Sequence, residues 1–143
     1  MGTLHSSILD LSAQQQNFGR LPRGLITEIK NVKDQATRWT SELGIHRPLQ
    51  IDESVREDAD YWPVDVVKSA TRHGFYSKWI PKFSGGQGYH PLSMFSFNRE
   101  VGGYCLGISN LVGAHYVGLG LITSSQSFKI LERITNQIRN AEK

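Results

Sequence analysis

The sequence predicts an all-α protein, a bundle of about five helices joined by short loops. Apolar residues recur at spacings of three and four in several segments, which is the period of a helix with one buried face. No segment alternates apolar and polar residues over a length that would indicate a half-buried strand. The 143 residues suit one domain. We expect a polar, patternless lead-in at residues 1–20 and one helical domain at residues 21–143.

The first helix is expected from Leu25 to Leu43 and should end at Gly44. Its buried stripe combines spacings of four and three: Leu25, Ile29, Val32, Ala36, Trp39 and Leu43. The following residues, 47–60, are acidic and contain Pro48, so they predict a solvated connecting loop or frayed turn. Their carboxylates lack the spacing and the glycine of a calcium loop.

The second helix is expected after an N-cap at Asp60, with Pro63 in its first turn and His73 and Gly74 at its end. Residues 75–81 are aromatic and are predicted to be extended. Residues 84–88, Ser-Gly-Gly-Gln-Gly, predict a tight backbone turn with positive φ. A phosphate cradle is the alternative, but neither the dinucleotide nor the P-loop spacing is present.

Three further helices complete the prediction. Pro91 can open the third, and Gly102 and Gly103 weaken its end. The fourth should cover residues 106–120. The fifth should begin at about Ser125, capped by Ser124 or Ser125, with one apolar face made of Phe128, Leu131, Ile134 and Ile138.

Composition limits the function. The net charge of +3 comes without a cluster of basic residues, so nucleic acid is a poor candidate partner. The lone Cys105 forbids an internal disulfide and agrees with a reducing, cytoplasmic location. The five histidines show no metal-ligand spacing, so we expect no metal site.

Residues 104–122 carry no formal charge. The run is long enough to tempt a transmembrane assignment, but it contains Asn110 and His115, is rich in glycine and lacks flanking Lys or Arg anchors. We expect a buried helix of a soluble bundle and no membrane span.

Two candidate catalytic groups in this region are weak. Residues 107–111, Gly-Ile-Ser-Asn-Leu, nearly match a nucleophile elbow, but the second glycine is missing and no strand precedes them. Ser109 is therefore predicted to be a helix or pocket hydroxyl. Arg99 and Glu100 are adjacent at a helix end, which favours a surface or interdomain contact over an acid–base couple. We assign no catalytic residue to this chain.

A succession of short motifs over residues 52–143 resembles the N-terminal helical domain of acyl-CoA dehydrogenases. The motifs are Gly74-Phe75, Ile80-Pro81, Gly85-Gly86-Gln87-Gly88, Arg99-Glu100-Val101-Gly102, His115, and Ser125 followed by Lys129 and Leu131. The family pattern runs as Pro-Glu-x-x-Gly-Gly-x-Gly, a Glu-Glu-Leu-Ala helix and a Gly-Thr-x-x-Gln-Lys ending. This chain departs from it in having Lys82 where Glu is frequent and Arg99 in place of the first Glu of the helix, which suggests a divergent branch.

The resemblance implies an orthogonal or up-down helical bundle followed, in the family, by a middle β-domain and a C-terminal helical domain. It implies an FAD-dependent enzyme that dehydrogenates an acyl-CoA thioester, passes electrons to an electron-transfer flavoprotein and forms a homo-oligomer, a tetramer. The catalytic carboxylate and most FAD contacts of the family lie outside this domain.

The resemblance also implies that the fourth helix walls the acyl pocket. Matched residue by residue, the substrate-binding positions are Ser109, Asn110, Gly113 and Val117. Spacings of three and four place the last three on one helix face. Gly113 would leave room for a long or bulky acyl group, or would instead let two helices pack closely. The alternative function is a stand-alone helical interaction module without flavin chemistry, and a large exposed apolar face would indicate a missing docking partner.

Overall fold

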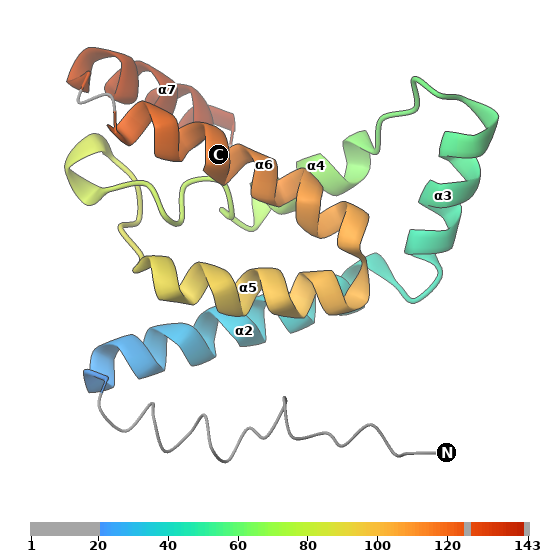
Figure 1. The fold of residues 1–143 in the computed structure, drawn as a ribbon, viewed down its shortest axis with the longest axis horizontal. Helices are drawn as coiled ribbons and strands as arrows, with labels where there is room; N and C mark the ends of the chain where they lie inside the picture. The colour runs from blue at the N-terminus through green and yellow to red at the C-terminus, as the bar shows by residue number, and fades with distance from the viewer. Residues whose placement is uncertain (1–20, 125–126, 142–143) are drawn as a thin grey trace, which may run out of the picture.

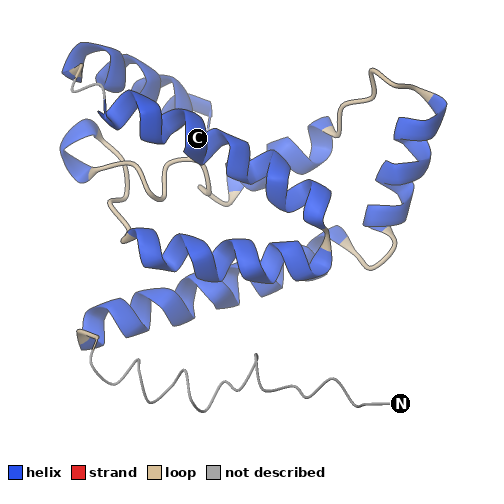
Figure 2. Ribbon diagram, in the orientation of Figure 1, coloured by secondary structure: helices blue, strands red, loops and turns tan. Residues whose placement is uncertain are grey.

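The fold is taken from a computed structural model, which describes residues 21–124 and 127–141. The expected lead-in at residues 1–20 lies outside the described residues. All regular structure in the described part is helical (Figures 1 and 2): α2 (Arg23–Leu43), α3 (Arg47–Glu57), α4 (Val64–Arg72), the 3-10 turn η2 (Lys82–Ser84), α5 (Pro91–Tyr104), α6 (Leu106–Ser124) and α7 (Phe128–Ala141). The all-α prediction is confirmed, with six α-helices in these residues where about five were expected.

Helices α2 and α5 pack along each other, and α6 packs against α5 (Figure 1). The predicted stripe of α2 accounts for its contact, because Val32, Ala36 and Trp39 are fully buried. The helix ends where predicted, at Gly44, whose φ of 83° is a conformation that favours glycine.

The core is centred on aromatic side chains from three segments. Trp39 of α2 meets the edge of Phe75 at 5.0 Å between ring centroids, and Phe75 lies 4.8 Å from Phe97 of α5. The indole N–H of Trp39 donates to the buried Ser69 hydroxyl of α4 at 3.0 Å. These contacts hold α2, α4 and α5 around one apolar cluster.

The prediction of a loop at residues 47–60 was wrong, because residues Arg47–Glu57 form α3. Pro48 lies in the first turn, where its missing N–H costs no hydrogen bond. The helix buries no residue of its own and stands apart from the other helices (Figure 1). Its sequence therefore lacks the apolar stripe on which helix prediction depends.

Two boundaries after α3 also differ from the prediction. Asp60 is not the N-cap of the next helix, which begins at Val64 directly after Pro63. Residues 75–79 form consecutive turns and Ile80 a bend, instead of an extended segment, because Gly74 reverses the chain with a φ of 65° and both Phe75 and Ile80 are buried.

The predicted glycine turn is confirmed. Gly85 and Gly88 have φ values of 92° and 67°. The turn folds back on the preceding residues, since the Gly88 N–H donates to the Ile80 carbonyl at 2.8 Å and the Gly86 N–H to the Pro81 carbonyl at 3.1 Å.

The last two helices differ from the prediction at their ends. Helix α6 continues past Gly120 to Ser124, so Ser124 is not the cap of α7, and Ser125 lies outside the described residues. The Ser127 carbonyl accepts the first hydrogen bonds of α7, from the N–H groups of Ile130 and Leu131. Leu131 is buried as expected, whereas Phe128 is 69% exposed.

Candidate functional site

Helix α6 has two contrasting faces. One face packs into the core through Ile108, Val112, Tyr116 and Leu119. The Tyr116 hydroxyl donates to the Phe75 carbonyl at 2.6 Å, and His115 Nε2 donates to the Tyr76 carbonyl at 3.1 Å. These two hydrogen bonds fix the rotation of α6 about its axis.

The opposite face of α6 is apolar and exposed. Leu106, Val117 and Leu121 are each about 70% exposed. Only 28% of the window Leu106–Thr123 is buried, so the expectation of a buried helix holds for one face alone. By length and composition this window, with a mean hydropathy of 1.3, is the one candidate membrane span in the part of the chain that the structure describes, and such a single helix is weak evidence for a membrane.

A groove between α5 and α6 brings the four predicted substrate-binding residues together. Ser109, Asn110, Gly113 and Val117 all line it, and its volume is about 650 Å³. The remaining lining residues are Asn98, Arg99 and Gly102 of α5 with Leu106 and Ala114 of α6. The groove is open to solvent along its length, with α5 and α6 as its walls.

Ser109 joins the two walls of the groove. Its hydroxyl is almost buried and donates to the Asn98 carbonyl of α5 at 3.3 Å. A Cβ atom added at Gly102 would lie 3.6 Å from the Ser109 hydroxyl oxygen, which is an ordinary van der Waals distance. The two helices therefore approach closely here, with room for a methyl group between them. Ser109 is thus a hydroxyl of the groove lining that donates its proton across the two helices.

Gly113 does not mediate close helix packing. A Cβ atom built at this glycine meets no heavy atom of the described residues within 4 Å. Among the described helices, Gly113 is therefore not a point of close approach. Its missing side chain enlarges the open groove instead.

The adjacent charges of α5 point to different neighbours. Glu100 accepts a hydrogen bond from the Thr37 hydroxyl of α2 at 2.9 Å, so this carboxylate serves the α2–α5 contact. Arg99 is exposed and lines the groove. Both residues were predicted to make a surface or interdomain contact, and Arg99 was not predicted to line the groove. Its position three residues before Gly102 could have indicated the shared face.

Asn98 is a second groove residue that was not predicted from the sequence. The side-chain oxygen Oδ1 of Asn98 is buried and has no hydrogen-bond partner among residues 21–124 and 127–141. A buried amide without a partner costs about 1 to 3 kcal/mol, so this group would gain from a ligand or a water molecule. No pattern in the sequence signals it.

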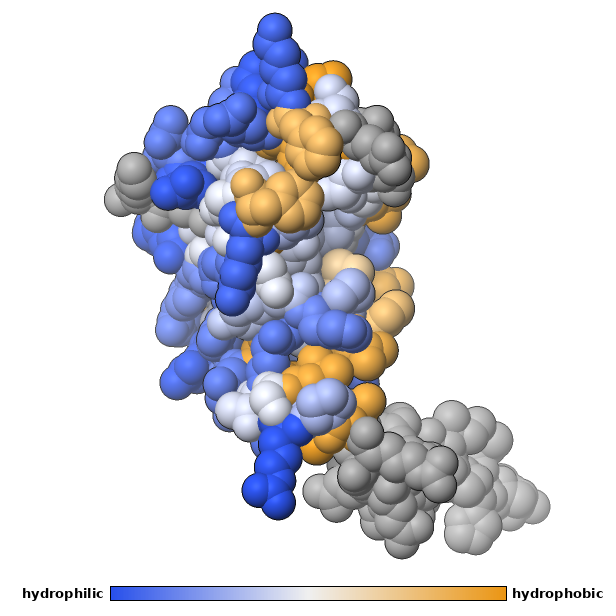
Figure 3. Space-filling model, turned by 90° about the vertical axis from the view of Figure 1, so that its left-hand side faces the viewer, coloured by the Kyte–Doolittle hydropathy of each residue, from blue (hydrophilic) through white to orange (hydrophobic). Residues whose placement is uncertain are grey.

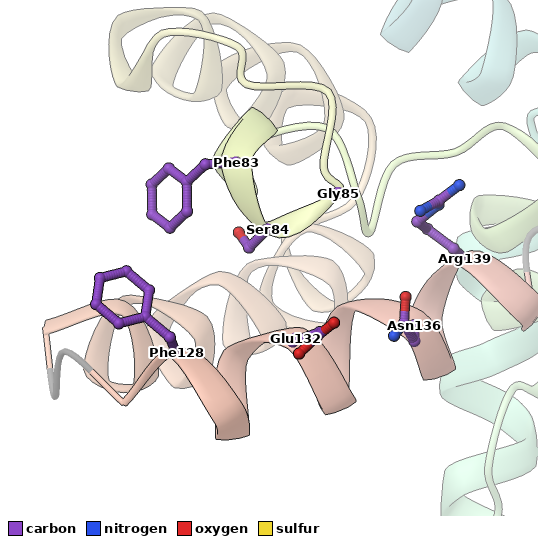
Figure 4. Close-up of a pocket in the computed structure, with 7 residues that line it drawn as sticks. All are labelled: Phe83, Ser84, Gly85, Phe128, Glu132, Asn136 and Arg139. Atoms are coloured by element: carbon purple, nitrogen blue, oxygen red, sulfur yellow. The ribbon is translucent and has the colours of Figure 1, made fainter.

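A second cavity, of about 420 Å³, lies between η2 and α7 (Figure 4). The rings of Phe83 and Phe128 meet edge to face at one end of it, with centroids 5.9 Å apart. Arg139 lies at the other end, beside Gly85 (Figure 4). Both phenylalanines are about 70% exposed, and the side of the molecule that carries η2 and the start of α7 shows apolar surface among polar residues (Figure 3).

Metal ligation has no candidate within residues 21–124 and 127–141, where no three His, Cys, Asp or Glu side chains converge.

Comparison with known proteins gives no match, since no family model, no curated protein and no solved structure is significantly similar to the chain. The resemblance to acyl-CoA dehydrogenases therefore rests on the sequence motifs alone.

Proposed function

We propose that the chain acts as the N-terminal helical domain of an FAD-dependent acyl-CoA dehydrogenase, and that the α5–α6 groove forms one wall of its acyl pocket. The observation that carries the proposal is that the residues selected by the family motifs, Ser109, Asn110, Gly113 and Val117, line one open groove. A groove of about 650 Å³ is in the range of small-molecule sites.

The role of this chain in the reaction is to hold and desolvate the acyl chain. Leu106, Ala114 and Val117 supply apolar surface, and each buried methylene contributes about 0.8 kcal/mol to binding. The α-proton is removed by a carboxylate that the family places outside this domain. Bound FAD supplies the hydride acceptor, and the proposal assigns no FAD contact to the described residues.

Two measurements on the native polypeptide that carries this segment test the proposal. Its mass in source cells should be well above the 16.1 kDa of this chain, and the purified protein should show flavin absorbance. It should oxidise acyl-CoA substrates with an electron-transfer flavoprotein or a dye as acceptor. A flavin-free protein of about 16.1 kDa would refute the proposal.

A substitution in the groove tests the site itself. Gly113→Leu should fold, because the added side chain begins in open space, and should lower kcat/KM for long acyl chains more than for short ones. Gly118→Leu is the matched control, since Gly118 lies on the same helix, also has nothing within 4 Å of an added Cβ, and does not line the groove. An identical chain-length profile in both variants would sink the assignment.

The second candidate is a helical interaction module without flavin chemistry. The exposed apolar face of α6 favours it, because such a face is typical of a surface that a partner covers. The mass and flavin measurements separate the two proposals.

A further inference from the structure

We infer that the molecule docks on an anionic lipid surface through the corner where η2 meets the start of α7. The η2–α7 corner consists of the exposed rings of Phe83 and Phe128 and the basic residues of the same two segments. The inference goes beyond the proposed function, because neither ring lines the α5–α6 groove. It concerns contact with one face of a bilayer and needs no helix that spans it.

Two aromatic side chains project from this corner. Phe83 of η2 is 73% exposed, Phe128 of α7 is 69% exposed, and their ring centroids lie 5.9 Å apart. Ile122, near the end of α6, lines a cavity of about 400 Å³ together with both rings. The apolar surface therefore extends from the two rings to the end of α6, and a contiguous exposed patch of this kind marks a site of interaction.

The net charge of the chain comes from the same two segments. Residues 82–84 and 127–141 contain four basic residues and one acidic residue: Lys82, Lys129, Arg133, Arg139 and Glu132. Their balance of +3 equals the net charge of the whole chain, so all other residues together sum to zero. The four basic side chains are exposed, and the ion pairs among the described residues lie elsewhere, between α3 and α4 and between α2 and the end of α4.

This combination of charge and exposed rings fits an anionic bilayer. Lys82 directly precedes Phe83 and Lys129 directly follows Phe128, so each ring can enter the acyl boundary while the ammonium beside it stays among the headgroups. Anionic lipids attract basic residues close to the membrane surface. A purely acidic surface would satisfy the charges and leave the rings in water, whereas an anionic bilayer satisfies both.

The position of the corner allows such a contact. The start of α7 and η2 lie at one end of the molecule, and α3 lies at the opposite end (Figure 1). The view onto the first of these ends shows apolar surface beside strongly polar residues (Figure 3). A flat, extended surface can therefore meet the rings and the basic residues together.

Flotation with lipid vesicles tests the inference on the native polypeptide that carries this segment. Partition is measured with vesicles of phosphatidylcholine alone and of phosphatidylcholine mixed with phosphatidylserine, each at low and at high salt. One variant, Phe83→Ser with Phe128→Ser, removes the rings and keeps the charge. The other, Lys82→Gln with Lys129→Gln, removes charge and keeps the rings. All four side chains are exposed, so both variants should fold, which circular dichroism checks.

Two matched controls change residues away from the corner. Ile45→Ser with Leu49→Ser removes two apolar side chains, 83% and 63% exposed, at the α3 end of the molecule. Arg56→Gln with Lys68→Gln removes two exposed positive charges on α3 and α4. Each control loses the same kind of group as one corner variant, so non-specific effects of lost charge or lost apolar surface appear in both.

We expect the native polypeptide to bind the phosphatidylserine vesicles about tenfold more tightly than phosphatidylcholine alone, and to lose this preference at high salt. Each corner variant should weaken binding by about fivefold or more, and each control by less than about twofold. Absence of binding, or binding that both corner variants retain, would overturn the inference. Binding that depends on the lysines and ignores the rings would overturn it too, since an acidic protein would then serve as well. Flavin content and turnover do not enter these measurements, so their outcome leaves the proposed function to its own tests.

Discussion

Gly86 shows how a single residue fixes the turn before α5. A Cβ atom at this position would overlap the carbonyl oxygen and the Cβ atom of Ile80, a buried residue that cannot yield. Gly86→Ala should therefore lower the free energy of unfolding by about 3 kcal/mol, the cost of overpacking against backbone. Gly118→Ala, in open space within α6, should instead raise it by about 0.5 to 1 kcal/mol. Urea denaturation of both variants checks the opposite signs, and equal effects would contradict the steric argument.

Tyr76 gives the protein a dependence on alkaline pH. Burial raises the pKa of its phenol above the ordinary value of 10.0, because the charged phenolate loses hydration in the folded state. The folded protein thus keeps this proton at a pH at which the unfolded chain releases it. The resulting stability is complete below pH 10 and is lost as pH rises through the raised pKa.

Replacement of this phenol tests the assignment. Tyr76→Phe should change the free energy of unfolding little at pH 7 and should make its decline between pH 9 and pH 11 shallower. Tyr104, whose pKa is also raised by burial, should cause the decline that remains. Denaturant titrations across this pH range measure both curves, and parallel curves for the two proteins would show that Tyr76 is not the group responsible.

At the scale of elements, α3 is the helix held least by packing. An isolated helix of 11 residues is marginal in water, and α3 buries none of its residues. Besides Ile51, which packs partly buried against the core, its polar tie to the fold is Arg47. The Arg47 Nη2 atom contacts Asp65 of α4 at 2.6 and 2.7 Å and the Tyr61 hydroxyl at 3.3 Å. The Asp65 side chain is 61% exposed, so the pair contributes no more than about 1 kcal/mol.

Removal of that tie should act locally. Arg47→Met should accelerate amide hydrogen exchange in α3 severalfold while leaving exchange in α2 and α5 unchanged, because those helices share the buried core. Arg56→Met, at the exposed end of α3, controls for the loss of a charge. If exchange in α3 were the same in both variants, the tie would not depend on Arg47.

The contrast between α2 and α3 explains which elements could be predicted from the sequence. Helix α2 has a regular stripe because one face meets the core, and its stripe and its end at Gly44 were both predicted. Helix α3 buries no residue and meets the core through Ile51, which is only partly buried, so no apolar stripe marks it. The turns at residues 75–79 were also missed, since their shape depends on Phe75 and Ile80 reaching a core formed by distant segments.

The groove was predictable only in part, for a related reason. Its wall on α6 follows from helix spacing within one segment, and Ser109, Asn110, Gly113 and Val117 were named from the sequence. Its wall on α5 depends on how α5 and α6 pack, which places Asn98 and Arg99 opposite those residues. Local periodicity carries no information on that placement.

The whole molecule exposes more apolar surface on α6 than a helix without a partner should. Val117 and Leu121 lie one turn apart on its outer face and are 69% and 72% exposed. The 143-residue chain on its own should therefore self-associate and bind a hydrophobic dye.

Val117→Lys with Leu121→Lys should reduce both effects and change the free energy of unfolding by less than about 0.5 kcal/mol, as exposed substitutions do. Leu119→Lys should instead unfold the chain, because Leu119 is only 7% exposed. Sedimentation and dye fluorescence measure these outcomes, and a wild-type chain that stays monomeric and dye-free would show that this face needs no partner.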